Sequence, residues 1–245
     1  MNRCIRSAAV SGAVVAGVLA TCGPPAVARD GGPLWAAAVI APGREGVVEV
    51  AGVADAPPGA TLTLVAPRGA RVTGTPLGAY RGSVAAGGRS ASYTVGGGTA
   101  ARPGPDRTFS FVLAVPADAV PGTRLRGCHL RLTDGQGVRR AAGRCSVTVG
   151  LAAPTLARPL SGVPLATRPE ISGTAHPGAQ VTVRDKDEQE ACATTAGPDG
   201  VWACTPGPAL PAGANRLQAV ATLNGVSAMS EQIDIAVAEA AAGPQ

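Results

Sequence analysis

The sequence predicts an all-β protein of two tandem antiparallel β-sandwiches, each with a disulfide that closes a hairpin. The 34 glycines and 22 prolines among 245 residues argue against long helices. Short runs in which apolar residues alternate with polar ones recur between turn-forming segments, as is typical of an antiparallel sandwich. Two pairs of cysteines, each placed symmetrically about a turn, indicate where the hairpins lie.

Residues 1–28 are predicted to be a signal peptide. Arg3 and Arg6 make its start basic, and residues 8–21 form an apolar run that is shorter than the roughly 20 residues needed to span a bilayer. Residues 26–28, Ala-Val-Ala, supply a small-x-small cleavage site, so a secreted, extracellular protein is expected. In the alternative, residues 19–22 resemble a lipobox, and a lipid on Cys22 would anchor the protein to the membrane.

Charge and motifs exclude several functional classes. The formal net charge is only +5, and two of the arginines lie in the expected signal peptide, whereas a nucleic-acid-binding protein would carry a concentrated basic footprint. The chain contains no G-x-S-x-G, H-E-x-x-H or glycine-rich phosphate-binding motif. We therefore expect no nucleic-acid partner, no enzymatic activity and no cofactor.

The first cysteine pair predicts a hairpin in residues 128–145. Its midpoint falls in the turn Asp-Gly-Gln-Gly at residues 134–137, so Cys128 lies opposite Cys145 at the roughly 4.5 to 5.5 Å that separates antiparallel neighbours. A disulfide tolerates that Cα separation. The apolar residues expected on the same inward side are Leu130, Leu132, Val147 and Val149.

The second pair, in CATTAGPDGVWAC at residues 192–204, is centred on Pro198. Hairpin geometry places Cys192 opposite Cys204 and Thr194 opposite Trp202. A zinc site would need closer ligand pairs, and a redox C-x-x-C is absent. Both pairs are therefore predicted to be disulfides and not metal ligands.

The turn signals divide the exported chain into two domains. The first is expected at residues 33–150, with strands near 47–53, 61–67 and 109–115. Its glycine-rich stretch 74–106 is compatible with one or two edge strands and a mobile loop. Residues 151–159 are expected to be a linker, residues 160–238 the second domain, and residues 239–245 a disordered tail.

The second domain carries three segments that resemble a known family. These are RPEISGTAHPGAQVTVRD, GPDGVWACTP and LPAGANRLQAVATLNG. They are similar to the bacterial immunoglobulin-like repeats of secreted and surface proteins. The matching positions are Pro169, Ile171, Gly173, Ala175, Pro177, Gly178, Ala179, Val181, Val183, Asp199, Gly200, Trp202, Leu210, Gly213, Leu217, Ala219 and Ala221.

This resemblance implies an immunoglobulin-like fold, and the first domain resembles it only generically. Such modules serve as spacers, adhesin units and accessory domains, so the fold alone does not fix the function. The expected function is an exported, non-enzymatic interaction or adhesion module at the cell surface. The alternative is an accessory protein that binds carbohydrate or a cell-wall polymer, so the partner is either an unknown protein or an envelope polymer.

Two clusters have both a functional and a structural interpretation. Asp185, Asp187, Glu188 and Glu190 could bind Ca²⁺, although a solvated hairpin turn is favoured because basic residues are interleaved with them. Tyr80 and Tyr93 could serve as platforms for sugar binding, although packing in the core or at an edge is favoured.

The candidate binding site lies on the first hairpin. With its two cysteines facing inward, four basic side chains face outward, and His129 is opposite Arg144. Such a stripe could contact an anionic polymer such as cell-wall phosphate. Its members are His129, Arg131, Arg140 and Arg144.

Overall fold

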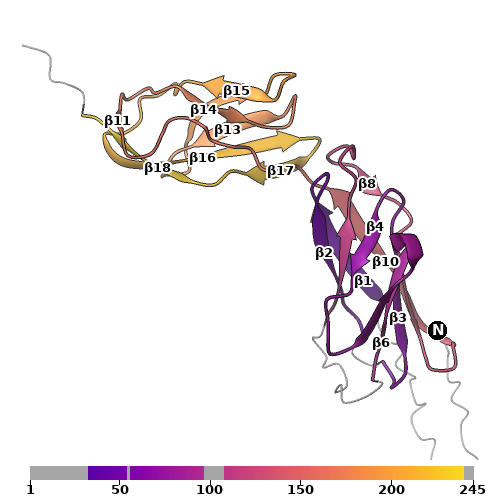
Figure 1. The fold of residues 1–245 in the computed structure, drawn as a ribbon. Coiled ribbons are helices and arrows are strands. Elements are labelled where there is room, and N and C mark those ends of the chain that lie inside the picture. The colour runs from indigo at the N-terminus through magenta and orange to yellow at the C-terminus, as the bar shows by residue number, and fades with distance from the viewer. Residues whose placement is uncertain (1–32, 54–55, 97–107, 240–245) are drawn as a thin grey trace, which may run out of the picture.

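The computed structural model describes residues 33–53, 56–96 and 108–239, which form two all-β domains (Figure 1). The expected signal peptide, Cys22, the stretch 97–107 and most of the expected tail lie outside these ranges. Within them, no helix is long and apolar enough to cross a bilayer.

The first domain packs a larger sheet, called the main sheet below, against a smaller second sheet. The main sheet has the order β1-β10-β9-β3-β6-β5, and β8 also pairs with β10. The second sheet has the order β2-β7-β4. The strands are β1 (Leu34–Ile40), β2 (Glu45–Val50), β3 (Thr61–Val65), β4 (Arg71–Gly74), β5 (Arg81–Val84), β6 (Ser90–Thr94), β7 (Phe109–Ala114), β8 (Arg124–Leu125), β9 (His129–Thr133) and β10 (Arg139–Val149), with a short 3-10 turn, η1 (Ala86–Gly88).

Alternation along the strands builds the core of this domain. In β7, Phe109, Phe111 and Leu113 are fully buried, while the residues between them are half-buried. The four side chains predicted to face inward in the first hairpin are buried as well. They are Leu130, Leu132, Val147 and Val149. The period of two in the sequence thus identified the inner face of both sheets.

Strand β1 forms one edge of the main sheet and pairs in parallel with β10. Leu34 lies beside Gly143, where a Cβ atom would be only 2.9 Å from the Leu34 Cβ. Glycine at this position lets the two backbones approach. At the same end, backbone hydrogen bonds join Trp35 to Ala51, directly after β2, so β1 also contacts the second sheet.

The glycine-rich stretch contributes two strands to the main sheet. β6 pairs with β3 on one side and with β5 on the other, and β5 is the edge strand. The prediction of one or two edge strands here is confirmed for β5 and wrong for β6, which is paired on both sides. Residues 97–106 of this stretch lie outside the described residues, so the expected mobile loop stays a prediction.

The second domain is a smaller sandwich of the same kind. Its larger sheet has the order β11-β18-β16-β13-β14, with β17 also paired to β16, and its smaller sheet pairs β12 with β15. The strands are β11 (Pro164–Leu165), β12 (Ile171–Thr174), β13 (Gln180–Arg184), β14 (Glu190–Thr195), β15 (Val201–Cys204), β16 (Gly213–Leu223), β17 (Val226–Met229) and β18 (Ile233–Val237). Trp202 and the inward residues of β13 and β16 form its core.

Part of the expected linker is paired with this domain. The backbone N–H groups of Thr155 and Ala157 donate to the carbonyls of Thr174 and Ser172 in β12. Leu151 is buried in the core of the second domain.

Both predicted disulfides are present. The Cα atoms of Cys128 and Cys145 are 5.2 Å apart, and those of Cys192 and Cys204 are 6.0 Å apart. The first bridge continues the β9–β10 ladder, so it closes a hairpin as predicted.

The second bridge does not close a hairpin ladder, and this part of the prediction is wrong. Cys192 lies in β14, which pairs with β13, whereas Cys204 lies in β15, which pairs with β12. The turn at residues 197–200 carries the chain from one sheet to the other. The bridge therefore links the two sheets of the sandwich.

Because the chain passes from one sheet to the other between β14 and β15, Thr194 and Trp202 are not opposite each other as predicted. Thr194 lies opposite Val181, and Trp202 lies opposite Gly173. β14 pairs with β13 in the larger sheet and β15 pairs with β12 in the smaller sheet, so β14 and β15 do not pair with each other.

We expect the double substitution Cys192→Ala/Cys204→Ala to destabilise the second domain by about 2–4 kcal/mol, because the unfolded chain loses a constraint. The measurement is denaturant unfolding followed by the emission of the buried Trp202. Cys128→Ala/Cys145→Ala is the matched control, since that bridge lies in the other core. An equal shift of the Trp202 transition in both variants would contradict the assignment of one bridge to each domain.

A turn from each domain meets at the junction. Asn224, between β16 and β17, donates from Nδ2 to the Pro121 carbonyl at 3.1 Å. Gly122 follows with φ +82°, and a Cβ atom there would lie 2.7 Å from the Asn224 Cβ. In Figure 1 the end of the second domain that carries β17 lies against one end of the first.

Gly122→Ala should push the two turns apart, because the added methyl group collides with Asn224. Small-angle scattering should then show a larger and broader distribution of interdomain distances. Gly69→Ala is the control, since Gly69 has a similar φ of +85° and nothing within 4 Å of the added atom. Identical scattering from both variants would show that the contact does not hold the domains together.

Candidate functional site

The basic residues of the first hairpin lie on the outer side of the main sheet. Arg144 in β10 is opposite His129 in β9, as the hairpin register predicts, and Arg131 follows two residues later in β9. All three are exposed, while the residues on either side of His129 and Arg131 are buried. Three of the four predicted site residues therefore share one face.

Arg140, the fourth predicted site residue, differs from the other three because it is paired with an acidic residue. A register shift between Arg139 and Ala141 interrupts the ladder beside it. Its guanidinium binds the buried carboxylate of Asp134, with Nε 2.9 Å and a terminal nitrogen 2.6 Å from Oδ2. Arg140 thus neutralises a charge at the hairpin turn and is not a free cation of the stripe.

Asp134 organises that turn. Its Oδ1 accepts hydrogen bonds from the backbone N–H groups of Gln136 and Val138. Burial raises the pKa of the Asp134 carboxyl, but these hydrogen bonds and the Arg140 guanidinium outweigh burial and hold the pKa below its ordinary value of 3.8. The sequence showed the Asp-Gly turn, but not that its carboxylate would be buried.

Three further residues extend this face, and the sequence interpretation missed them. Arg124 in β8 lies opposite Thr148 of β10, and Arg126 lines a hollow of about 690 Å³ together with Arg124, His129 and Arg144. Trp35 in β1 lies beside Arg144 and is 61% exposed. Its position between the buried Leu34 and Ala36 could have indicated an outward indole.

We call the set Arg124, Arg126, His129, Arg131 and Arg144 the basic face. The ion pairs found among the described residues involve none of these five side chains. The exposed carboxylates Glu45 and Glu49 lie on β2, in the second sheet. The second sheet also carries the exposed Arg71 on β4, so it presents both signs of charge. The strands of the main sheet contain no acidic residue.

The two tyrosines considered as sugar platforms belong to the core, so the core interpretation is confirmed. Tyr93 is fully buried and Tyr80 is 7% exposed, and both rings contact Phe109. The Tyr93 hydroxyl donates to the Ser110 carbonyl at 2.8 Å and accepts from the Leu77 N–H at 3.0 Å. Burial raises the pKa of Tyr93, although the hydrogen bond from the Leu77 N–H acts in the opposite direction.

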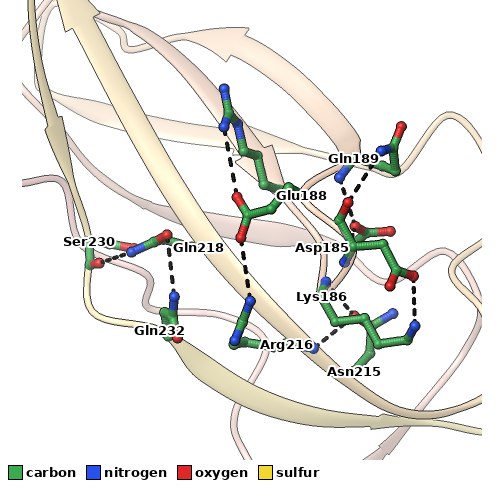
Figure 2. Close-up of polar contacts among 11 residues, drawn as sticks. Asp185, Lys186, Glu188, Gln189, Asn215, Arg216, Gln218, Ser230 and Gln232 are labelled. Carbon is green, nitrogen blue, oxygen red and sulfur yellow. Dashed lines mark hydrogen bonds and ion pairs between the residues drawn. The ribbon is translucent and has the colours of Figure 1, made fainter.

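The acidic cluster is a hairpin turn between β13 and β14, as favoured from the sequence. Asp185 accepts hydrogen bonds from the backbone N–H groups of Asp187 and Gln189. Glu188 lies between Arg184 and Arg216, at 3.8 and 3.4 Å, and Figure 2 shows these charges compensating one another. No group of metal-binding side chains gathers among the residues that the structure describes.

No family model and no curated protein matches the chain. Among solved structures, the BSP domain of a biofilm-associated protein is 20% identical, with 85% of this chain and 30% of that chain covered and a TM-score of 0.30. The C-terminal domain of the AgI/II polypeptide BspA of Streptococcus agalactiae is 10% identical, with 83% and 100% covered and a TM-score of 0.28. A non-cellulosomal cohesin of Archaeoglobus fulgidus is 15% identical, with 47% and 90% covered and a TM-score of 0.30.

At these TM-scores the matches carry no argument about function. The immunoglobulin-like fold of the two domains rests on their own strand order, with two packed sheets and a first strand parallel to the last. The resemblance of the second domain to bacterial immunoglobulin-like repeats remains a prediction.

We expect the first domain to lose stability in acid because of Asp134. Its pKa is lower in the folded state, so its contribution is complete above the ordinary pKa of 3.8 and disappears as the pH falls through the lower, folded value. Asp134→Asn should remove this part of the pH dependence. Calorimetric unfolding across the acidic range measures it, with the exposed Asp118→Asn as control. An unchanged acid profile in Asp134→Asn would contradict this assignment.

Proposed function

We propose that the protein is an extracellular, non-enzymatic interaction module whose first domain binds an anionic polymer of the cell envelope. The observation that carries the proposal is the basic face, whose five basic side chains have no ion-pair partner among the described residues. Four of them, Arg124, Arg126, His129 and Arg144, line one hollow, and Arg131 lies beside it on β9. Multiple arginines on a flat surface can each bind one acidic group of a chain molecule, and arginine binds carboxylate and phosphate in a bidentate manner.

The lack of acidic residues in the strands of the main sheet supports an anionic polymer as the ligand. The carboxylates of β2 lie in the opposite sheet, so the basic face presents one sign of charge to an approaching ligand. Protein interfaces usually bury an apolar centre. Here Arg144 and His129 lie on the neighbouring strands β10 and β9, and the exposed apolar residues Trp35 and Val65 lie on β1 and β3, to either side of them.

The disulfides support an extracellular location. Disulfides persist in oxidising compartments, and the four cysteines of the two domains form two bridges. The signal peptide expected at residues 1–28 agrees with export, and a lipid on Cys22 would place the same module on the membrane.

The proposal is tested with the exported chain, residues 29–245, on immobilised polyphosphate and polygalacturonate. We expect retention on an anionic polymer at low salt and release at high salt, because exposed charges are screened beyond about 8 Å at physiological ionic strength. Arg124→Gln, Arg126→Gln, Arg131→Gln and Arg144→Gln together should abolish retention.

The control variant also loses four positive charges, but from arginines outside the basic face. Arg44, Arg71, Arg158 and Arg168 are exposed and lie outside the basic face, so their replacement by Gln should leave retention nearly unchanged. Failure of the parent protein to bind either polymer would contradict the proposal, and would favour a protein partner. Equal losses in the two quadruple variants would show that only the net charge matters.

A further inference from the structure

We propose that the ligand of the basic face is a carboxylated polysaccharide, with one sugar ring stacked on Trp35 and an adjacent carboxylate bound by Arg144. This inference rests on the proposed function and names its ligand class. The observation behind it is the parallel pairing of β1 with β10, which places an exposed indole directly beside an unpaired arginine.

Trp35 is available for a ligand. Its side chain is 61% exposed, whereas the other tryptophan, Trp202, is 2% exposed. Among the described residues, neither the indole of Trp35 nor the guanidinium of Arg144 has an ion pair, a side-chain hydrogen bond or a ring contact. A large, flat, solvent-exposed ring of this kind is costly to leave in water, and aromatic side chains are enriched where ligands bind.

The pairing register places one residue from each of four neighbouring strands in a single row on the outer face of the main sheet. Trp35 is paired with Arg144, Arg144 with His129, and His129 with Val65. Neighbouring strands are about 4.8 Å apart, so the row extends over roughly 14 Å. The order along it is Trp, Arg, His and Val, and Arg131 lies about 7 Å from His129 along the same strand.

This arrangement fits an acidic sugar chain better than an inorganic polyanion. The CH face of a pyranose ring packs on an indole, and a carboxylate on the same or the next ring can then accept two hydrogen bonds from the Arg144 guanidinium. Polyphosphate would use the arginines equally well but would gain nothing from Trp35. The indole therefore distinguishes the two ligand classes.

The test compares three probes with the exported chain: an oligogalacturonate, its uncharged methyl ester, and polyphosphate. Because Trp202 is buried, the exposed part of the tryptophan emission reports on Trp35. We expect the oligogalacturonate to shift this emission and the methyl ester to bind much more weakly. Polyphosphate should leave the emission unchanged.

Calorimetric titration of variants completes the test. Trp35→Ala should weaken binding of the oligogalacturonate about tenfold or more, as for an aromatic hot spot, and leave polyphosphate binding intact. Trp35→Phe should restore part of the affinity. Val39→Ala is the matched control, because Val39 is an exposed apolar residue on the same face of β1.

The outcomes separate this inference from the proposed function. Equal binding of the oligogalacturonate by Trp35→Ala and the parent would overturn the inference, and if the arginine variant still lost both polymers the proposed function would stand. Equal weakening of polyphosphate binding by Trp35→Ala would also overturn it, because the indole would then only support the fold of the face. If the parent bound no polymer, both proposals would fail.

Discussion

The pairing of β9 with β10, held at its end by the Cys128–Cys145 disulfide, decides what the first domain shows to solvent. Side chains alternate along a strand, so a slip of one residue would exchange the inner and outer faces. With the two cysteines facing inward, Leu130 and Val147 enter the core, while His129 and Arg144 are exposed. The register of β9 against β10 therefore determines both which side chains form the core and which form the basic face.

The features that could be predicted from the sequence are those set by residues close together along the chain. The strand period, the first hairpin and both cysteine pairings follow from local spacing, and the structure agrees with them. The sequence did not predict the partner of β1, because parallel pairing joins segments about 110 residues apart and has no turn to mark it. Trp35 was therefore not connected with Arg144.

The errors have equally specific causes. The symmetric spacing about Pro198 looked like a hairpin, but β14 and β15 find their backbone partners in other strands, so the chain crosses between sheets. Arg140 was counted with the outward cations because alternation could not foresee a register shift or the buried carboxylate of Asp134. In the second domain, by contrast, the interleaving of Glu188 with basic residues correctly indicated a compensated turn (Figure 2).

The junction at Gly122 and Asn224 has a consequence for binding to a repeating ligand. A polymer that fixes the first domain also restricts the second, and a freely jointed pair of domains would lose orientational entropy in the process. The hydrogen bond from Asn224 to Pro121 and the close approach at Gly122 are the contacts that would restrict this freedom before any ligand arrives. If the first domain binds a polymer as proposed, a junction restricted in this way would lower the entropy lost on binding.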